Sequence, residues 1–467
     1  MTFEEAAALS GFELLSAGEG GLEPCGFETV CIDSREAAPG ALFVALAGEN
    51  HDGHKFVEDA FRAGAAGVIA EKSKVEPFGL LDAARRTGKA LIVAGDTLRA
   101  LQSLAEAYIN RFPGLLRIGI TGSSGKTTTK ELAAAMIGIE RNVVFNEGNL
   151  NSDSGLPLSV FRIRTGHEVG IFEMGMNRKG EIAELAAILR PDIAVITNTG
   201  SAHAGLIGSE RGIAVEKKAI FSRFTGKELA ILPEDGDFTE FLTEGINGRR
   251  LFFGKTASKK FNGAEIRGLF GSVITWGGVS VNFRLPGGHN LMNALAAAAV
   301  AEAAGVSDDA VRSGLASAKP LFGRSEVIEG EFTIVRDCYN ANPDSMEKAI
   351  SLCDEADCAG KRVYIIGSML ELGGSSKEAH EKLGRRLAIS KADMIFLFGE
   401  ETKYSYAELK NTKNKFVFHT NSIDELKLKT RDNAKKGDMI LLKGSRGCEL
   451  ERAVNFEVLK PAHITGV

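Results

Sequence analysis

The chain has 467 residues, which exceeds a single ordinary domain and favours about two to four domains. With 44% hydrophobic residues, 25% charged residues and a net charge of -5, it has the composition of a soluble globular protein and gives no reason to expect a nucleic-acid partner. The N-terminus is acidic and no long apolar run follows, so we expect no secretion signal and no membrane span. Six scattered cysteines without a Cys-x-x-Cys pair favour reduced thiols in the cytoplasm.

Short apolar runs alternate with alanine- and leucine-rich stretches along the chain. Strands that are apolar throughout are typical of parallel sheets covered by helices on both faces, so the pattern predicts α/β architecture throughout. The strand-like runs include 41–46, 90–95, 193–198, 362–367, 394–399 and 439–444, and the helical stretches include 98–110 and 293–304.

Three domains are expected from this pattern. The first spans 1–97 and ends before the helical stretch at 98–110. The second spans 98–318. Pro320 and Gly323 then interrupt the helical pattern and predict a hinge, after which the third domain spans 319–467.

The most informative segment is 118–129, in which an apolar strand runs into a glycine turn and a helix then opens with lysine and threonines. Such a turn directs backbone N–H groups and a helix N-terminus at an anion such as a nucleotide polyphosphate. Lys126 would neutralise phosphate charge, and the hydroxyl of Thr127 would reach Mg²⁺. The predicted phosphate-binding residues are Gly122, Ser123, Ser124, Gly125, Lys126, Thr127 and Thr128.

Polar residues that follow apolar strands are candidates for the same site, because α/β sites lie at the carboxyl ends of strands. Glu173 follows the run 169–172 and is either a Mg²⁺ ligand or a solvated loop glutamate. His203 follows the strand at 193–198 and is either a second metal ligand or bonded to a backbone carbonyl. Lys217 lies in a helical stretch, where a surface lysine is the default interpretation.

Three further clusters are rich in hydrogen-bonding groups. Asn290 and Asn293 are one helical turn apart, so both amides could face one ligand; an N-cap with a solvent-facing asparagine is the alternative. The segment 337–343 follows a strand and ends in an Asn-Pro turn. The segment 443–446 carries two cations that suit a carboxylate or phosphate, although a surface turn also fits.

Taken together, these motifs resemble those of the Mur ligases, the ATP-dependent amide-bond-forming enzymes of peptidoglycan synthesis. The resemblance covers nearly the whole chain, from Asp33-Ser34-Arg35 to the segment 443–446, and the run 339–346 is typical of the branch that adds D-alanyl-D-alanine. It implies three α/β domains: a small N-terminal domain that binds UDP, a central P-loop ATPase-like domain with a parallel sheet, and a C-terminal Rossmann-like domain.

The resemblance also implies a reaction. ATP would phosphorylate the terminal carboxylate of UDP-N-acetylmuramoyl-tripeptide, and the amine of D-alanyl-D-alanine would attack the acyl phosphate. The third peptide residue is either diaminopimelate or lysine. The enzyme is expected to be a cytoplasmic monomer that requires ATP and Mg²⁺.

Roles for individual residues follow from the resemblance, with Lys217 expected to be carbamylated. The implied catalytic residues are Lys126, Glu173, His203 and Lys217, and the implied metal ligands are Thr127, Glu173, His203 and Lys217. The residues expected to contact ATP beyond the loop are Asn290, Asn293, Arg324 and Asp337. The implied substrate-binding residues are Ser34, Arg35, Asn151, Asn340, Asn342, Ser345 and Lys443.

The chain departs from the family pattern at a few positions, including Ala219 and Ser368, where acidic residues are common. Two other functions are compatible with parts of the sequence. A folylpolyglutamate synthase would keep the loop, Glu173 and His203 but would lack the Asp33-Ser34-Arg35 block and the run 339–346. A nucleotide-gated regulatory protein would bind ATP without forming an amide.

Overall fold

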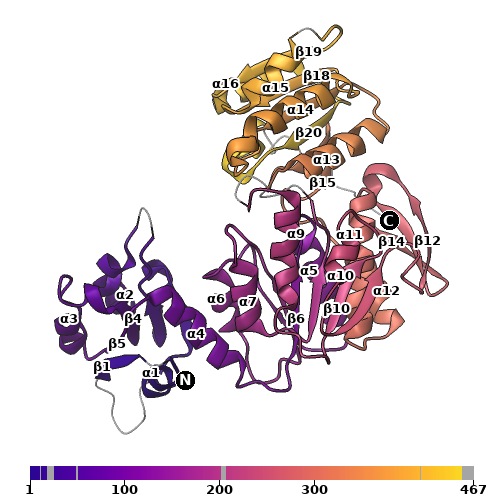
Figure 1. Ribbon diagram of the computed structural model, residues 1–467. Coiled ribbons are helices and arrows are strands. Elements are labelled where there is room, and N and C mark those ends of the chain that lie inside the picture. The colour runs from indigo at the N-terminus through magenta and orange to yellow at the C-terminus, as the bar shows by residue number, and fades with distance from the viewer. Residues whose placement is uncertain (11, 18–25, 49–50, 201–206, 411, 455–467) are drawn as a thin grey trace, which may run out of the picture.

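The computed structural model describes residues 1–10, 12–17, 26–48, 51–200, 207–410 and 412–454. Figure 1 shows three groups of elements that follow one another along the chain, each built around its own mainly parallel sheet. This confirms the predicted three-part α/β architecture. No helix in the described ranges is both long and apolar enough to cross a membrane.

The N-terminal group contains a five-stranded sheet in the order β1-β5-β4-β3-β2. β2 to β5 run parallel, and β1 pairs with β5 in the antiparallel direction. Its elements are α1 (Phe3–Ser10), β1 (Glu13–Ala17), β2 (Thr29–Cys31), η1 (Ser34–Glu36), β3 (Ala41–Val44), η2 (Gly53–Phe56), α2 (Val57–Ala63), β4 (Gly67–Glu71), η3 (Lys72–Lys74), α3 (Leu80–Thr87) and β5 (Ala90–Ala94).

Helix α4 (Thr97–Ile109) joins the N-terminal and central groups. It packs against α1 and β4 on one side and against α6 (Gly155–Val160) and α7 (Glu181–Leu189) on the other. Leu101 and Leu104 are fully buried in a core shared by both groups. Because the helix belongs to both cores, the boundary between residues 97 and 98 stays a prediction, as does the one between 318 and 319.

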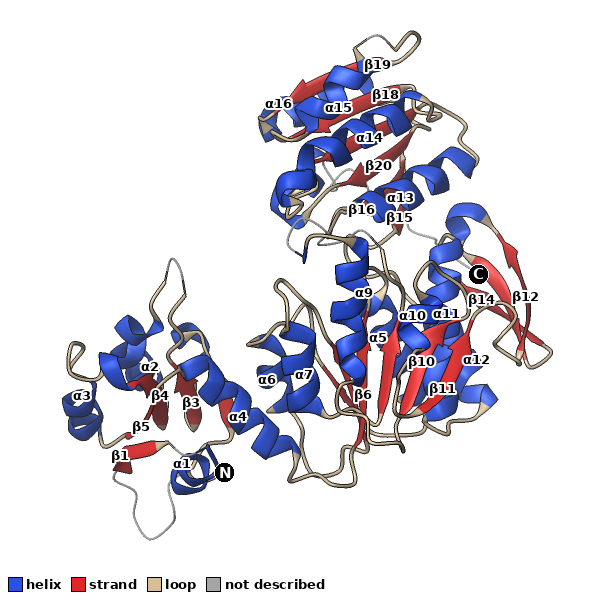
Figure 2. Ribbon diagram, viewed as in Figure 1, coloured by secondary structure: helices blue, strands red, loops and turns tan. Residues whose placement is uncertain are grey.

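The central group is built on a parallel sheet in the order β11-β10-β9-β6-β8-β7. Figure 2 shows helices on both of its faces. The remaining elements of this sheet layer are β6 (Leu116–Thr121), α5 (Lys126–Ile137), β7 (Val143–Phe145), β8 (Val169–Glu173), β9 (Ile193–Ile196), α9 (Glu210–Lys218), η4 (Ala219–Phe221), β10 (Leu229–Pro233), α10 (Thr239–Thr243), β11 (Arg249–Phe253), α11 (Gly288–Ala303) and α12 (Asp308–Ser317).

The order of the central strands determines where a ligand can bind. β6 lies between β8 and β9. The next strands in the chain, β7 and β8, lie on one side of β6, and β9, β10 and β11 lie on the other. The carboxyl ends of β6, β8 and β9 therefore meet where the connections diverge, which is the usual ligand position in open α/β sheets. Both faces are apolar: Ile171 of β8 packs with α5 and α11, while Phe172 packs in the core that contains α7.

A second, antiparallel sheet in the central group was not predicted from the sequence. It has the order β12-β13-β14 and is formed by β12 (Phe261–Ile266), β13 (Ser272–Trp276) and β14 (Val279–Phe283). The short helix η5 (Gly268–Phe270) follows β12, and its Leu269 is buried in the core of the C-terminal group against α13 (Pro343–Glu355). The two groups thus share an apolar contact besides the connecting chain.

The C-terminal group has a sheet in the order β15-β16-β20-β17-β18-β19, parallel except for the edge strand β15. β20 lies between β16 and β17, so their carboxyl ends also meet at one edge. The other elements are β15 (Glu326–Glu329), β16 (Thr333–Asp337), β17 (Arg362–Gly367), η6 (Gly373–Ser375), α14 (Ser376–Ala388), β18 (Met394–Phe398), α15 (Thr402–Leu409), β19 (Phe416–Thr420), α16 (Ile423–Asn433), β20 (Met439–Lys443), η7 (Arg446–Cys448) and η8 (Leu450–Ala453).

Candidate active site

The predicted phosphate-binding loop is the turn between β6 and α5. Gly125 has a φ of 78°, and a Cβ at this position would lie 2.2 Å from Oδ1 of Asn293. A Cβ on Gly122 would lie 1.8 Å from Oγ1 of Thr197. Both glycines are therefore required by close neighbours as well as by the turn. Lys126, Thr127 and Thr128 form the first turn of α5, as the sequence predicted.

Two residues after β9 hold the loop in shape. Asn198 accepts a hydrogen bond from the backbone N–H of Ser124 at 3.0 Å and donates one to the Ser124 carbonyl at 2.9 Å. Thr197 donates to the same carbonyl at 2.7 Å. The hydroxyl of Ser123 accepts a hydrogen bond from Gly200 N–H at 2.9 Å. These contacts pre-organise the loop, which lowers the entropy cost of gripping an anion.

Lys126 folds back over the loop, and its Nζ donates to the carbonyl of Gly122 at 2.8 Å. Burial lowers the pKa of this lysine; the charge of Glu173 opposes that effect and the charge of Arg324 adds to it. No ion pair with a carboxylate is formed by Lys126 within the described ranges. Its positive charge is thus held close to the loop without a strong internal partner.

Glu173 is the last residue of β8 and is 2% exposed, so it is not a solvated loop residue. Its Oε2 accepts a hydrogen bond from the hydroxyl of Thr127 at 2.6 Å, and its Oε1 accepts one from the amide of Asn151 at 2.7 Å. Hydroxyl and carboxylate oxygens are ligands that Mg²⁺ prefers. The described residues contain no cluster of three or more His, Cys, Asp or Glu, so an ion here would need ligands from water and substrate as well.

Lys217 is not on the surface, contrary to the default interpretation of its helix. In α9, Lys217 is 1% exposed whereas the apolar Val215 is 52% exposed. The pKa of Lys217 is well below its usual range because of burial, and the nearby charge of Lys126 lowers it further against the opposing charge of Glu216. Packing has turned a lysine inward and a valine outward, which favours a chemical role for the amine. His203 lies outside the described residues.

Asn290 and Asn293 are both buried in the first turns of α11, and neither is an N-cap, because Gly287 takes that position. The amide of Asn293 donates to Oδ1 of Asn290 at 3.1 Å, and Asn290 donates to the carbonyl of Pro286 at 2.8 Å. Since Asn293 also contacts Gly125, this pair lies directly beside the phosphate-binding loop.

Residues of the C-terminal group approach the same region. The guanidinium of Arg324 stacks on the ring of Tyr339 at 4.2 Å and is close enough to Lys126 to affect its pKa. Asp337 accepts a hydrogen bond from Ser325 N–H at 2.9 Å and forms an ion pair with Lys443 at 3.1 Å. The Nζ of Lys443, which is 2% exposed, also donates to the carbonyl of Asn340. The segment at 443 is thus a buried strand end, not a surface turn.

Several of the predicted substrate-binding residues have local structural partners. Asn342 and Ser345 form a reciprocal capping box at the start of α13. Ser34 and Arg35 lie in η1, beside α2 in the N-terminal group, and the Arg35 guanidinium is paired with Asp33. That contact lowers the pKa of Asp33 to about 2. The substrate-binding roles of these residues remain predictions.

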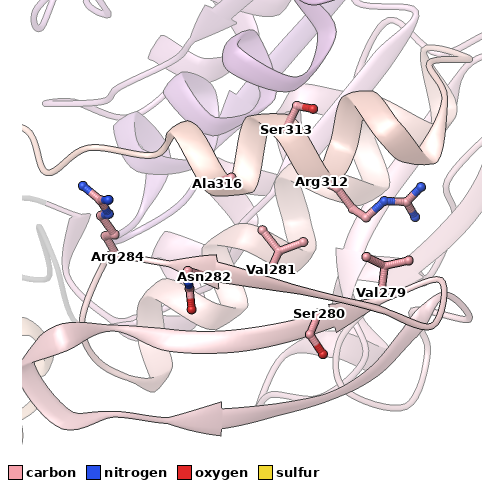
Figure 3. A pocket seen from close by; sticks show the side chains of 8 residues that line it. All are labelled: Val279, Ser280, Val281, Asn282, Arg284, Arg312, Ser313 and Ala316. Atoms are coloured by element: carbon pink, nitrogen blue, oxygen red, sulfur yellow. The ribbon is translucent and has the colours of Figure 1, made fainter.

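A surface hollow of about 510 Å³ lies between β14 and α12 (Figure 3). The figure shows Arg284 and Arg312 at its two ends. None of its lining residues is one of the predicted site residues. It is therefore separate from the site formed by the loop, Glu173 and Lys217.

Sequence reasoning missed three residues that support this site: Asn146, Thr197 and Asn198. Asn146 follows β7, and its amide bridges the backbone of Glu173. Thr197 and Asn198 follow the buried strand β9, whereas Asn146 follows β7, of which only Val144 is buried. The rule that polar residues at the carboxyl ends of strands reach the site would have identified Thr197 and Asn198, whereas the place of Asn146 follows only from the pairing of β7 with β8.

Comparison with known proteins gives a consistent result along the chain. Residues 27–108, 120–301 and 323–446 match the family models described as Mur ligase family, catalytic domain; Mur ligase middle domain; and Mur ligase, glutamate ligase domain. The chain is 42% identical over 428 residues to the UDP-N-acetylmuramoyl-tripeptide–D-alanyl-D-alanine ligase of Treponema pallidum, covering 91% of this chain and 93% of the relative.

Solved structures agree. A crystal structure of MurF from Acinetobacter baumannii superposes with a TM-score of 0.85 at 28% identity, covering 98% of each chain. MurF ligase from Thermotoga maritima in complex with ADP gives a TM-score of 0.77 at 30% identity, covering 92% of this chain and 96% of that one. By its three domain matches and its near full-length relatives, this chain belongs to the Mur ligase family.

Proposed function

We propose that this protein is the ATP-dependent ligase that joins D-alanyl-D-alanine to UDP-N-acetylmuramoyl-tripeptide in peptidoglycan synthesis, releasing ADP and phosphate. The observation that carries the proposal is the 42% identity to a ligase of that name over 91% of the chain, with the phosphate loop, Glu173 and Lys217 together in one site. A folylpolyglutamate synthase is not favoured, because the similarity extends through the N-terminal group and the run 339–346.

The first step joins two anions, so their repulsion has to be offset by cations. A carboxylate oxygen of the tripeptide attacks the γ-phosphorus of ATP, the bond from that phosphorus to the bridging oxygen breaks, and ADP leaves. Lys126 would neutralise charge on the transferring phosphoryl group, with the loop N–H groups and the α5 N-terminus directed at the phosphates. Asn290, Asn293, Arg324 and Asp337 would contact the rest of the nucleotide.

Thr127 and Glu173 have the oxygen donors to hold Mg²⁺, and their 2.6 Å contact fits a shared ion. When bound, Mg²⁺ would neutralise phosphate charge. We propose His203 and a carbamylated Lys217 as ligands of a second ion. The lowered pKa of Lys217 supports this, because only the neutral amine reacts with CO₂; the product is a carbamate oxygen ligand and a proton.

In the second step the amine of D-alanyl-D-alanine attacks the acyl carbon, the bond to phosphate breaks, and the amine loses a proton. Asn340, Asn342, Ser345 and Lys443 of the C-terminal group, and Asn151 of the central group, are proposed to bind the peptide parts. Ser34 and Arg35 are proposed to bind the UDP part within residues 1–97. Since one chain supplies all these residues, we propose a monomer that works in the cytoplasm, where ATP is available.

A substrate panel tests this proposal. ADP formation should require ATP, Mg²⁺, UDP-N-acetylmuramoyl-tripeptide and D-alanyl-D-alanine together, with tripeptides ending in diaminopimelate or lysine tested side by side. ADP formation with a folate and glutamate instead would establish the folylpolyglutamate alternative. Tight ATP binding without ADP formation on any substrate pair would indicate a regulatory protein.

A further inference from the structure

Lys130 is a completely buried lysine that none of the roles above uses. It lies on α5, one helical turn after Thr127, with 0% exposure. Lysine is almost never fully buried unless its charge is paired. Its Nζ forms an ion pair with Glu131 at 2.9 Å, lies 5.3 Å from the centre of the Phe145 ring, and donates to the backbone carbonyl of Asn146.

Asn146 in turn forms two hydrogen bonds with the backbone of Glu173. Its Oδ1 accepts the N–H of Glu173 at 2.8 Å, and its Nδ2 donates to the Glu173 carbonyl at 3.1 Å. The same Nδ2 donates to the carbonyl of Leu150 at 2.9 Å. One amide thus fixes the end of β8 and the loop that carries Asn151.

The two carboxylate oxygens of Glu173 are contacted by residues of α5 and of the loop at 147–151, the two elements that the contacts of Lys130 and Asn146 connect. Oε2 contacts Thr127 on α5, three residues before Lys130, and Oε1 contacts Asn151, the residue after Leu150. Lys130 therefore ties α5 to the strand end and loop that present the carboxylate. If burial alone mattered here, an apolar side chain of similar length would fill the space without the cost of burying an amine.

We propose that Lys130 and Asn146 are positioning residues that hold the Glu173 carboxylate in the orientation needed to bind Mg²⁺ with ADP or ATP. This inference rests on the proposed role of Glu173 as a metal ligand. In this role Lys130 and Asn146 would act through the backbone of Glu173 and through the loop at 147–151, and would not themselves be ligands of the metal or nucleotide. Residues that orient a metal ligand typically change metal affinity by about 10- to 100-fold when replaced.

The test measures ADP binding by calorimetry across a Mg²⁺ titration, and compares the wild type with Lys130→Met, Asn146→Ala and Glu173→Gln. The matched control is Lys415→Met, because the Nζ of Lys415 also donates to backbone carbonyls, those of Ser390 and Ala392, but in the C-terminal group. Melting temperatures without nucleotide report the structural cost of each change.

We expect Lys130→Met and Asn146→Ala to raise the Mg²⁺ concentration that gives half of the gain in ADP affinity by about tenfold. ADP affinity without Mg²⁺ should stay as in the wild type, and Lys415→Met should change only the melting temperature. If Lys130→Met does not fold, Asn146→Ala decides the outcome.

Two results would overturn different statements. If Glu173→Gln leaves the Mg²⁺ dependence unchanged, the proposed metal role of Glu173 is wrong. If Glu173→Gln alters it while Lys130→Met and Asn146→Ala only lower the melting temperature, Lys130 and Asn146 serve packing alone and the inference is wrong.

Discussion

The carboxyl edges of the central and C-terminal sheets both present lysines that are partly or fully buried, but these lysines differ in their partners. At the central edge, Lys126 reaches only a loop carbonyl, and Lys217 forms no ion pair or hydrogen bond through Nζ within the described residues. At the C-terminal edge, Lys443 is neutralised by Asp337 at 3.1 Å, on the neighbouring strand and in register with it.

The two central lysines form no ion pair with a carboxylate among the described residues, whereas Lys443 forms one with Asp337. Burial lowers the pKa of both central lysines; the charge of Arg324 lowers the pKa of Lys126 further, and the charge of Lys126 lowers that of Lys217 further. Each of these lysines therefore destabilises the fold when no anion is bound. A lysine that is shielded from water without an ion pair lowers stability, so we expect such lysines where a ligand supplies the anion. Removing a central lysine should therefore cost activity without a loss of stability, whereas removing Lys443, which is also proposed to bind the peptide, should cost stability as well.

The largest effect is expected for Lys126→Ala. Removing a group that stabilises developing charge typically costs about a hundredfold or more in turnover, so phosphate release with both substrates should become undetectable. The nucleotide-free variant should melt no lower than the wild type, because a partly buried cation that forms no ion pair is gone. Turnover above roughly a tenth of the wild-type value would refute the assigned role.

The second effect concerns Lys217 and CO₂. Removing CO₂ from the buffer should lower activity by about tenfold or more, as for the loss of a metal-orienting group, and bicarbonate should restore it. The requirement for bicarbonate should grow as the pH falls, because protonation of the amine competes with its carbamylation. A ¹³C carbamate signal from labelled bicarbonate should be present in the wild type and absent in Lys217→Met.

The matched control is Lys218→Met. Lys218 is next in sequence, but its Nζ donates to the carbonyl of Phe241 at 2.6 Å and lies over the Phe241 ring. The labelled signal should persist in this variant. A signal lost equally from both variants would mean that the carbamate does not form on Lys217.

Most of the fold was predictable because its strands are continuous apolar runs. The predicted runs at 90–95 and 362–367, for example, correspond to β5 and β17. The sheet of β12 to β14 was not predicted, since its strands are partly exposed and their sequences mix polar residues and glycines. In β14, for instance, only Phe283 is buried.

The candidate site was predictable where chemistry follows directly from a motif, as in the loop and Glu173. The burial of Lys217 was not visible in its helix, because it depends on the packing of α9 against elements such as α7, which the sequence of α9 does not reveal. The two hydrogen bonds between Asn146 and the backbone of Glu173 were not predicted, because a lone asparagine after a short strand has many uses. Only the pairing of β7 with β8 brings Asn146 to Glu173.

The third effect tests the paired side of the comparison. Lys443→Met leaves Asp337 without its cation, which for a fully buried pair costs about 3–5 kcal/mol. Because the side chain of Asp337 is 17% exposed, we expect about 2 kcal/mol, seen as a lower melting temperature. The double variant Lys443→Met/Asp337→Asn should recover part of this loss. An unchanged melting temperature in the single variant would mean that the pair is not structural.

The smallest effect uses a paired carboxylate in the N-terminal group whose contribution depends on pH. Burial tends to raise the pKa of Asp52, but hydrogen bonds from the ring and backbone N–H of His54 and from Lys74 outweigh it and lower the pKa to about 2. A carboxylate with a lowered folded-state pKa stabilises the protein above its unfolded value, near 3.8, and loses that contribution as the pH falls towards 2. After allowance for solvent screening, Asp52→Asn should cost about 1 kcal/mol at neutral pH and a smaller amount near pH 2, where the carboxylate of the folded state is partly protonated. Thermal unfolding followed from pH 7 to pH 2 measures this, and a difference between wild type and variant that stays constant with pH would show that His54 and Lys74 do not act through the charge of Asp52.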